Sequence, residues 1–213
     1  MKQHQGVWLP DGERHLIEWM DKSGEIVDGR GSYQIRKLRA ALQHVRHFRV
    51  AVDVGAHVGF WTMHLAKRFE TVHSFEPVAA HRECFAANVH DERVSLHACA
   101  LGDREGRVSI HTAATSSGDS WVDGDGDIPL RRLDAYALEN VDFIKLDCEG
   151  YELFALRGGE ETLKRCKPCV IVEQKPGRAQ KFGLPETGAV KYLQGLGATL
   201  RATLSGDFIL SWG

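Results

Sequence analysis

The chain has 213 residues, of which 43% are hydrophobic and 26% are charged, and its formal net charge at pH 7 is −2. This balance is typical of a globular protein, and the length suits one domain with a sizeable core, although two small domains would also fit. The near-neutral charge indicates no general nucleic-acid binding. Because no apolar segment reaches the roughly 20 residues of a membrane helix, we expect no membrane partner.

The number and spacing of the cysteines indicate the redox state of the cellular compartment. Five cysteines, at positions 84, 99, 148, 166 and 169, are odd in number, and their spacing fits no disulfide framework. This favours a reducing environment, and the N-terminus has no apolar signal-peptide core, so we expect a cytoplasmic protein. The pair Cys166-Lys-Pro-Cys169 precedes an apolar run instead of opening a helix, which disfavours a thioredoxin-type redox pair, and a zinc site would need further ligands.

The first part of the chain has a helical pattern. An apolar stripe recurs at helical spacing and comprises Ile35, Leu38, Leu42 and Val45. A shorter helix is expected over residues 11–20, after the Leu9-Pro10 break. We therefore expect residues 1–48 to form a helical segment packed on a main domain at 49–213.

From residue 48 onward, apolar runs alternate with helical patterns. Strands are expected at 48–53, 71–75 and 94–97, with helices at 60–68 and 78–89 between them. Strands that alternate with helices of about ten residues predict βαβ units and a parallel sheet.

The second half continues this alternation. The expected elements are strands at 107–112, 141–147 and 168–173, helices at 150–165 and 186–194, a polar loop at 112–129, and a hairpin of strands at 198–202 and 208–211. The long helix is expected to break at Gly158-Gly159. The pattern predicts an α/β, Rossmann-like fold whose seven-stranded, mostly parallel sheet ends in a C-terminal antiparallel hairpin.

A glycine-containing turn follows the first strand of this alternation. Gly55 and Gly59 would let a ligand approach the backbone, and Glu76, 23 residues after Asp53, ends the next strand, where an acid can accept hydrogen bonds from ribose hydroxyls. A dinucleotide fold needs glycine where His57 stands. The imidazole therefore favours a cofactor without phosphates, such as S-adenosylmethionine, over a nicotinamide dinucleotide. A plain tight turn is the alternative.

Several segments in order resemble the FkbM-type methyltransferase family. They are AVDVGAHVGFWT (51–62), HSFEPVAAHRECFAANV (73–89), ACALGD (98–103), RRLDAY (131–136), FIKLDCEGYELFALRGGEETL (143–163) and VIVEQK (170–175). The resemblance runs over about 125 residues and implies a class I methyltransferase fold that uses S-adenosylmethionine. It also implies an acceptor among sugars, natural products or peptide side chains.

The resemblance implies roles for individual residues. The residues implied to bind the cofactor are Asp53, Gly55, His57 and Gly59 in the glycine turn, Glu76 at the ribose, Leu101 near the adenine and Asp147 near the methionine end. His57 departs from the family pattern, in which asparagine is frequent. We expect it either to contact the methionine carboxylate or to hold the turn.

Three acids follow the strand in FIKLDCEGYE. Asp147 is the best candidate for the reaction centre, Glu149 lies two residues further, and Glu152 suits the first turn of the next helix. The alternative is that all three only favour a helix start. Lys145, inside the strand, is expected to be structural.

A metal site is a further expectation at the same sheet edge. Asp147 and Glu173, with Gln174, would offer oxygen ligands to Mg²⁺ or Ca²⁺, in a layout that resembles metal-dependent catechol-type methyltransferases. The candidate catalytic residues are therefore Asp147, Glu149 and Glu173. The basic residues Lys175, Arg178 and Lys181 would contact a negatively charged substrate or are simply solvated.

We expect a methyltransferase that acts on a hydroxyl of a sugar, glycan or small molecule. The alternatives are N-methylation of a peptide or protein amide and a non-catalytic module that binds S-adenosylmethionine. A nicotinamide-dependent dehydrogenase is disfavoured by His57 and the terminal hairpin. The sequence does not indicate an oligomeric state.

Overall fold

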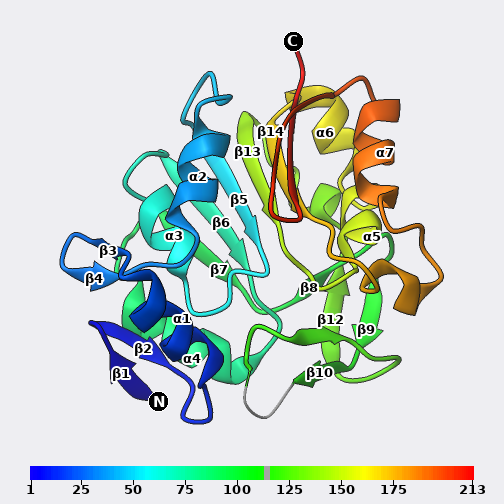
Figure 1. Cartoon of the computed structure of the whole chain (residues 1–213). Coiled ribbons are helices and arrows are strands. Elements are labelled where there is room, and N and C mark those ends of the chain that lie inside the picture. The colour runs from blue at the N-terminus through cyan, green and yellow to red at the C-terminus, as the bar shows by residue number, and fades with distance from the viewer. Residues whose placement is uncertain (113–115) are drawn as a thin grey trace.

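The computed structural model describes residues 1–112 and 116–213, and a seven-stranded sheet forms its centre (Figure 1). From edge to edge the strands are β15 (Thr199–Leu204), β16 (Asp207–Ser211), β14 (Cys169–Glu173), β13 (Val141–Leu146), β5 (Val50–Val54), β6 (Thr71–Phe75) and β7 (Val94–His97). Neighbouring strands are parallel, except that β16 runs antiparallel to both β14 and β15. This sheet confirms the predicted α/β, Rossmann-like fold and its C-terminal antiparallel hairpin.

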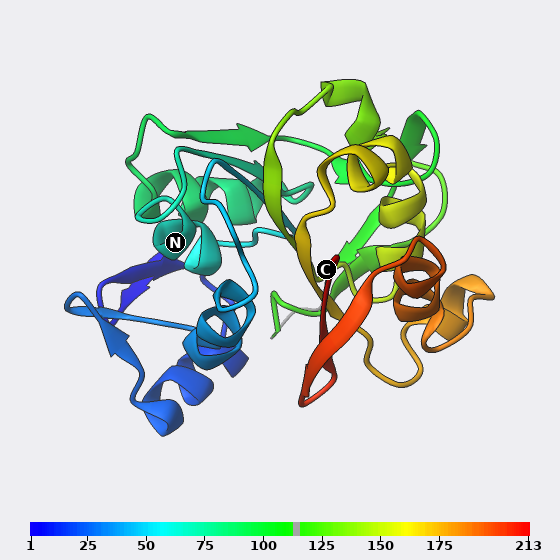
Figure 2. The ribbon, with the colours of Figure 1, turned by 90° about the horizontal axis from the view of Figure 1, so that it is seen from above.

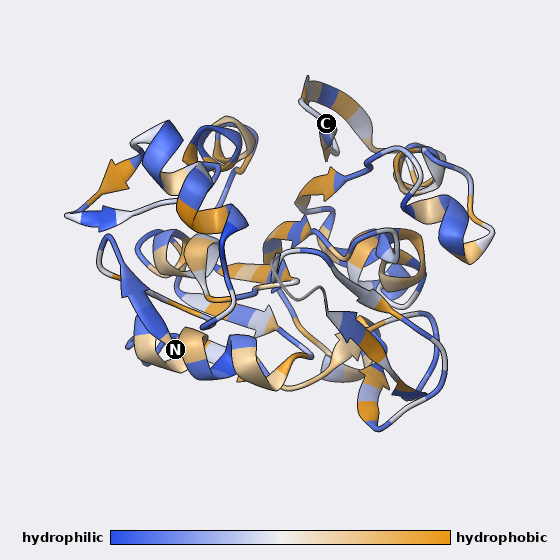
Figure 3. Cartoon of the chain, turned by 60° about the horizontal axis from the view of Figure 1, so that its bottom comes forward, coloured by the Kyte–Doolittle hydropathy of each residue, from blue (hydrophilic) through white to orange (hydrophobic). Residues whose placement is uncertain are grey.

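Helices cover both faces of the sheet. One face carries α1 (His15–Ser23), α2 (Ile35–Leu42), α3 (Phe60–Leu65) and α4 (Ala79–Asn88), and the other carries α5 (Glu152–Arg157), α6 (Glu160–Cys166) and α7 (Gly188–Gly195). Figure 2 shows the two groups on opposite sides of the strands. Every residue of β13 is buried, as expected for a parallel strand covered on both faces. Figure 3 shows hydrophobic residues concentrated along the central strands.

The N-terminal segment is not purely helical, which corrects our expectation. It contains two small hairpins, β1 (Lys2–His4) with β2 (Val7–Leu9) and β3 (Ile26–Val27) with β4 (Arg30–Gly31). Each hairpin turns through two residues with positive φ, Gln5-Gly6 and Asp28-Gly29, and such pairs are the usual signal for a tight hairpin turn. The helical period of the neighbouring residues obscured this signal. Helix α1 also begins at His15, later than expected.

The loop expected at 112–129 is partly β-structure, which also corrects the prediction. Within it lie β11 (Ser120–Val122) and the start of β12 (Ile128–Arg131), whereas residues 113–115 lie outside the described residues. The partner strands are β8 (Ala100–Leu101) and β9 (Gly106–Val108) for β12, and β10 (Ile110–Thr112) for β11. His111 on β10 stacks on Trp121 at 4.2 Å between ring centroids, a contact that local sequence does not reveal.

The predicted break at Gly158-Gly159 is confirmed, because it separates α5 from α6. A Cβ atom at Gly158 would lie 1.9 Å from the carbonyl oxygen of Gly102, so the chain can pass there only with glycine. Two short 3₁₀ helices complete the fold, η1 (Leu133–Tyr136) and η2 (Ala179–Phe182). None of the helices in the described part of the chain has the length and apolar character needed to cross a bilayer.

Candidate active site

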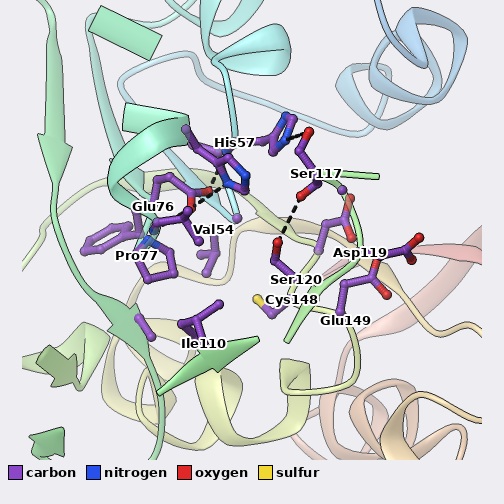
Figure 4. Close-up of a pocket in the computed structure, with 18 of the residues that line it drawn as sticks. Val54, His57, Glu76, Pro77, Ile110, Ser117, Asp119, Ser120, Cys148 and Glu149 are labelled. Atoms are coloured by element: carbon purple, nitrogen blue, oxygen red, sulfur yellow. Dashed lines mark hydrogen bonds and ion pairs between the residues drawn. The ribbon is translucent and has the colours of Figure 1, made fainter. Parts of the chain in front are cut away.

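A cavity lies where β5, β6 and β13 end (Figure 4). Ligands of open parallel sheets bind outside the carboxyl ends of the strands, so this position is the expected one. The cavity wall combines the residues that follow these strands with others from the N-terminal segment and from the β10–β11 hairpin. The predicted site residues that line it are Gly55, His57, Glu76, Leu101, Asp147 and Glu149.

The glycine turn after β5 lies directly against the end of β13. Gly55 has a φ of +74°, and a Cβ atom there would lie 1.9 Å from the carbonyl oxygen of Asp147. Gly59 has a φ of +93° and lies at the start of α3, where a Cβ atom would meet Val89 Cγ2 at 2.7 Å. Gly55 thus brings the turn to the cavity, and Gly59 allows α3 to pack against the end of α4.

Glu76 is a buried carboxylate at the end of β6, and its acceptor capacity is partly used. The N–H groups of His57 and Val78 donate to Oε2 and Oε1 over 2.8 Å each, and His81 Nδ1 lies 3.2 Å from Oε1. Burial opposes the charge of Glu76, but the hydrogen bond from His81 and the nearby N–H donors outweigh it, so its pKa lies below the usual value. Glu76 therefore presents an ionised carboxylate to the cavity.

His57 connects the glycine turn to the far wall of the cavity. Its Nε2 lies 2.8 Å from Ser117 Oγ (Figure 4). Its ring packs edge-on against that of His81, with 4.3 Å between the ring centroids. Burial, together with the charge of His81, lowers the pKa of His57 to about 3, so the ring is neutral at physiological pH. The Ser117 hydroxyl donates to Glu13, so His57 Nε2–H is the donor to Ser117.

Asp53 does not line the cavity, although the family resemblance implied that it binds the cofactor. It is fully buried beneath the turn, where Thr62 Oγ1 donates to Oδ2 over 2.7 Å and Lys145 Nζ lies 3.2 Å from Oδ1. Lys145 also donates to the carbonyl oxygen of Gly55 over 2.7 Å. Burial opposes the positive charge of Lys145, but the negative charges of Asp53 and Asp147 outweigh burial and raise the pKa of Lys145. These two residues therefore support the turn from below.

Asp147, Glu149 and Glu173 form a cluster at the adjoining sheet edge, and carboxylate oxygens of the three lie within 4.8 Å of one another. Burial, followed by the charge of Asp147, raises the pKa of Glu149 to about 7. Burial and Asp147 also raise the pKa of Glu173. Lys175 Nζ lies 2.9 Å from Glu173 Oε2 and 3.8 Å from Glu149 Oε1, and Arg178 Nε lies 2.9 Å from Glu149 Oε2.

Two neighbouring residues have other partners. Glu152 Oε1 accepts hydrogen bonds from the N–H groups of Cys148 and Gly150 over 2.9 and 3.0 Å, which agrees with its expected place at a helix start. Gln174 does not join the carboxylate cluster, because its Oε1 accepts from the N–H of Ala189 at 3.0 Å, in the first turn of α7. The oxygen that Gln174 would offer to a metal is thus used by a backbone N–H group.

The segment 116–120 closes one side of the cavity and is held by three separate parts of the chain. Glu13 Oε2 accepts from the N–H of Ser117 over 2.8 Å and from its hydroxyl, and Glu13 Oε1 accepts from the N–H of Leu16. His57 contacts the Ser117 hydroxyl, and Arg178 pairs with Asp119. The residues before Gly55 thus contribute directly to the site.

Sequence reasoning missed Glu13, Tyr33, His81 and Ser117. His81 could have been found, because it lies in the first turn of α4, five residues after Glu76. Tyr33 lines the cavity, and burial with the charge of Asp147 raises its pKa to about 12, so its hydroxyl keeps its proton. Glu13 and Ser117 meet across 104 residues of sequence, for which no local pattern exists.

Comparison with known proteins gives one family. A family model described as the Methyltransferase FkbM domain matches residues 53–200. No curated protein matches the chain.

Solved structures share the fold. A methyltransferase FkbM from Methylobacillus flagellatus KT superposes with a TM-score of 0.54 at 21% identity, over 79% of this chain and 45% of its own, so this chain spans less than half of that protein. A Streptococcus mutans protein described as a methyltransferase, in complex with SAH, superposes with a TM-score of 0.54 at 12% identity, over 84% of this chain and 97% of its own. Precorrin-6y C5,15-methyltransferase from Geobacter metallireducens GS-15 superposes with a TM-score of 0.52 at 13% identity, over 85% of this chain and 92% of its own.

Proposed function

This chain belongs to the FkbM methyltransferase family, and from that premise we propose that it transfers a methyl group from S-adenosylmethionine to a hydroxyl oxygen of a sugar, glycan or other small molecule. The observation that carries the proposal is the carboxylate cluster of Asp147, Glu149 and Glu173 beside a cavity at the carboxyl ends of parallel strands. A cofactor cavity next to proton acceptors is what O-methylation requires.

The cofactor would lie along the glycine turn. The backbone at Gly55 and His57 would face the methionine end, Glu76 would accept hydrogen bonds from the ribose hydroxyls, and Leu101 would pack on the adenine. His57, Val78 and His81 use three of the roughly four lone-pair positions of the Glu76 carboxylate, and the one left on Oε2 is available to a ribose hydroxyl. Asp53 and Gly59 act in this proposal by shaping the turn, since neither lines the cavity.

Methyl transfer is an in-line displacement. The acceptor oxygen forms a bond to the methyl carbon while the carbon–sulfur bond breaks, which leaves S-adenosylhomocysteine, and the hydroxyl proton passes to a carboxylate. Alignment supplies much of the rate, and a general base adds to it. Asp147 is the proposed base, because its side chain is 27% exposed whereas Glu149 and Glu173 are 7% and 3% exposed.

A divalent ion on Asp147 and Glu173 is the second way to activate the hydroxyl. The donor set consists only of oxygens and therefore fits Mg²⁺ or Ca²⁺. The ammonium of Lys175 lies against Glu173, however, so an ion would have to displace it. Metal dependence is tested by adding Mg²⁺ or a chelator to the assay below.

Two alternatives remain in the proposal. The first is N-methylation of a peptide amide, which needs the same cofactor site. The second is a non-catalytic module, against which the carboxylates beside the cavity weigh.

All five cysteines are free, which supports the proposed cytoplasmic location.

The proposal is tested by transfer of label from methyl-tritiated S-adenosylmethionine to a panel of monosaccharides, oligosaccharides and peptides, followed by identification of the methylated atom. Label on a hydroxyl oxygen, lost in Asp147→Asn, is the expected result. Label on an amide nitrogen would establish the first alternative, and binding of cofactor without transfer to any acceptor class would support the second.

A further inference from the structure

Lys175 occupies an unusual place for a loop lysine. Its ammonium lies 2.9 Å from Glu173 and 3.8 Å from Glu149, and these carboxylate side chains are only 3% and 7% exposed. The Lys175 side chain itself is 41% exposed and lines the cavity. The ammonium thus stands between two buried acids and the space where an acceptor would bind.

The contacts differ from those of an ordinary surface ion pair. Exposed pairs hold neither partner firmly, whereas here the acids are buried and a second cation, Arg178, joins Glu149 to Asp119. Among the described residues, Glu149 Oε2 has no hydrogen bond of good geometry despite Arg178 Nε at 2.9 Å. An ammonium held against two carboxylates donates hydrogen bonds and accepts none, so Lys175 is a donor and not a base.

We propose that Lys175 is the built-in cation of the acceptor site: it occupies the place between Glu173 and Glu149 that a divalent metal would take, and its ammonium donates a hydrogen bond to the acceptor hydroxyl oxygen. The inference rests on the proposed O-methylation and adds to it a catalytic residue. An ammonium has three donors, and Glu173 uses one, so donors remain for a ligand.

This arrangement assigns a separate task to each group. Lys175 stabilises the negative charge that develops on the acceptor oxygen, and Asp147 takes the hydroxyl proton. The oxygen–methyl bond forms as the sulfur–methyl bond breaks, and S-adenosylhomocysteine leaves with the electron pair of that bond. The proton then passes from Asp147 to solvent. No metal is required for this sequence.

A metal titration tests the inference without knowledge of the acceptor. Mn²⁺ binding is measured by calorimetry on the full chain, for wild type, Lys175→Met and the control Lys181→Met. Lys181 lies six residues further along the chain, in η2, and its ammonium lies over the ring of Trp121. Removal of Lys175 leaves the buried Glu173 without its cation, so we expect Lys175→Met to bind Mn²⁺ about tenfold or more tightly than the other two proteins. Equal affinity in all three, or no binding to Lys175→Met, would overturn the proposal.

S-adenosylhomocysteine binding separates this inference from the proposed function. We expect all three proteins to bind it alike, since in this proposal the Lys175 ammonium binds the acceptor and no atom of the cofactor. If wild type failed to bind it, the proposed function itself would fall. With an acceptor in hand, Lys175→Met should lose about 100-fold in kcat, and Lys175→Arg should retain part of the activity. Unchanged kcat in Lys175→Met would refute the catalytic role.

Discussion

At Gly55 the backbone has a φ of +74°, and a Cβ atom would lie 1.9 Å from the carbonyl oxygen of Asp147. Backbone, unlike a flexible side chain, cannot move aside cheaply. We expect Gly55→Ala to lower the free energy of unfolding by about 3 kcal/mol and to abolish cofactor binding. Urea unfolding and calorimetry with S-adenosylhomocysteine measure the two effects.

Gly124→Ala is the matched control for Gly55→Ala. Gly124 has nearly the same φ, +72°, but a Cβ atom there would have nothing within 4 Å. The substitution Gly124→Ala should therefore lower the free energy of unfolding only by the strain of the left-handed conformation, about 1 kcal/mol. Equal losses in the two variants would contradict the role assigned to the contact with Asp147.

His57 gives the protein a pH dependence of known sign. Its pKa in the folded state is about 3, below the usual value, so between that value and the unfolded pKa of about 6.5 only the unfolded state binds the proton. Stability must therefore fall as pH falls through this range. Between about pH 7 and about pH 5, His57 alone should lower the free energy of unfolding by about 2 kcal/mol.

The test of this dependence compares wild type with His57→Asn by urea unfolding at both pH values. His64 also has a pKa lowered by burial, to about 4, but it is the same in both proteins. We expect the variant to lose less stability on acidification than wild type. The same loss in both proteins would mean that His57 is not buried in its neutral form.

The position of a residue could be predicted from the sequence where it depends on nearby residues. Gly55 and Glu76 line the cavity because a strand–turn–helix places them at the end of a sheet. The pattern failed to show that Asp53 lies beneath the turn, because Thr62 and Lys145 take its carboxylate only after folding. Glu13 could not be predicted, because its partner Ser117 lies 104 residues away.

At the scale of elements, the regular βα units were predictable and the small hairpins were not. The strands β6 and β7 have the predicted bounds, because each apolar run ends at a turn signal. The strand β11 is only three residues long and half-buried, and it depends on pairing with β10. Such a short strand leaves almost no alternation in the sequence, so its formation follows from tertiary contacts.

The 116–120 segment gives a prediction at this scale. Loss of Glu13 would remove the acceptor for the Ser117 N–H and hydroxyl, and hydrogen bonds to a charged group contribute about 1.5–3 kcal/mol. We expect Glu13→Ala to open this segment, to speed its cleavage by a protease, and to weaken S-adenosylhomocysteine binding.

Glu18→Ala is the control, because Glu18 is exposed on α1. It should leave both cleavage and binding as in wild type. Slow cleavage and normal binding in Glu13→Ala would show that the contacts of Ser117 do not hold the segment.

In the whole molecule, the part that matches the family and the part before it build one site together. Residues 53–200 match the family model and supply the glycine turn, Glu76 and the carboxylate cluster. From outside that range, Tyr33 lines the cavity, and Glu13 holds Ser117, which also lines it. The central claim is therefore that the cavity is a cofactor site in which Glu76 holds the ribose.

Calorimetric titration of wild type, Glu76→Ala and Glu83→Ala with S-adenosylhomocysteine tests this claim most directly. Glu83 lies on the exposed side of α4 and is the control. We predict that wild type and Glu83→Ala bind alike and that Glu76→Ala, checked for folding by its melting temperature, binds about 10- to 100-fold more weakly. Absence of binding by wild type, or equal binding by Glu76→Ala, would contradict the account.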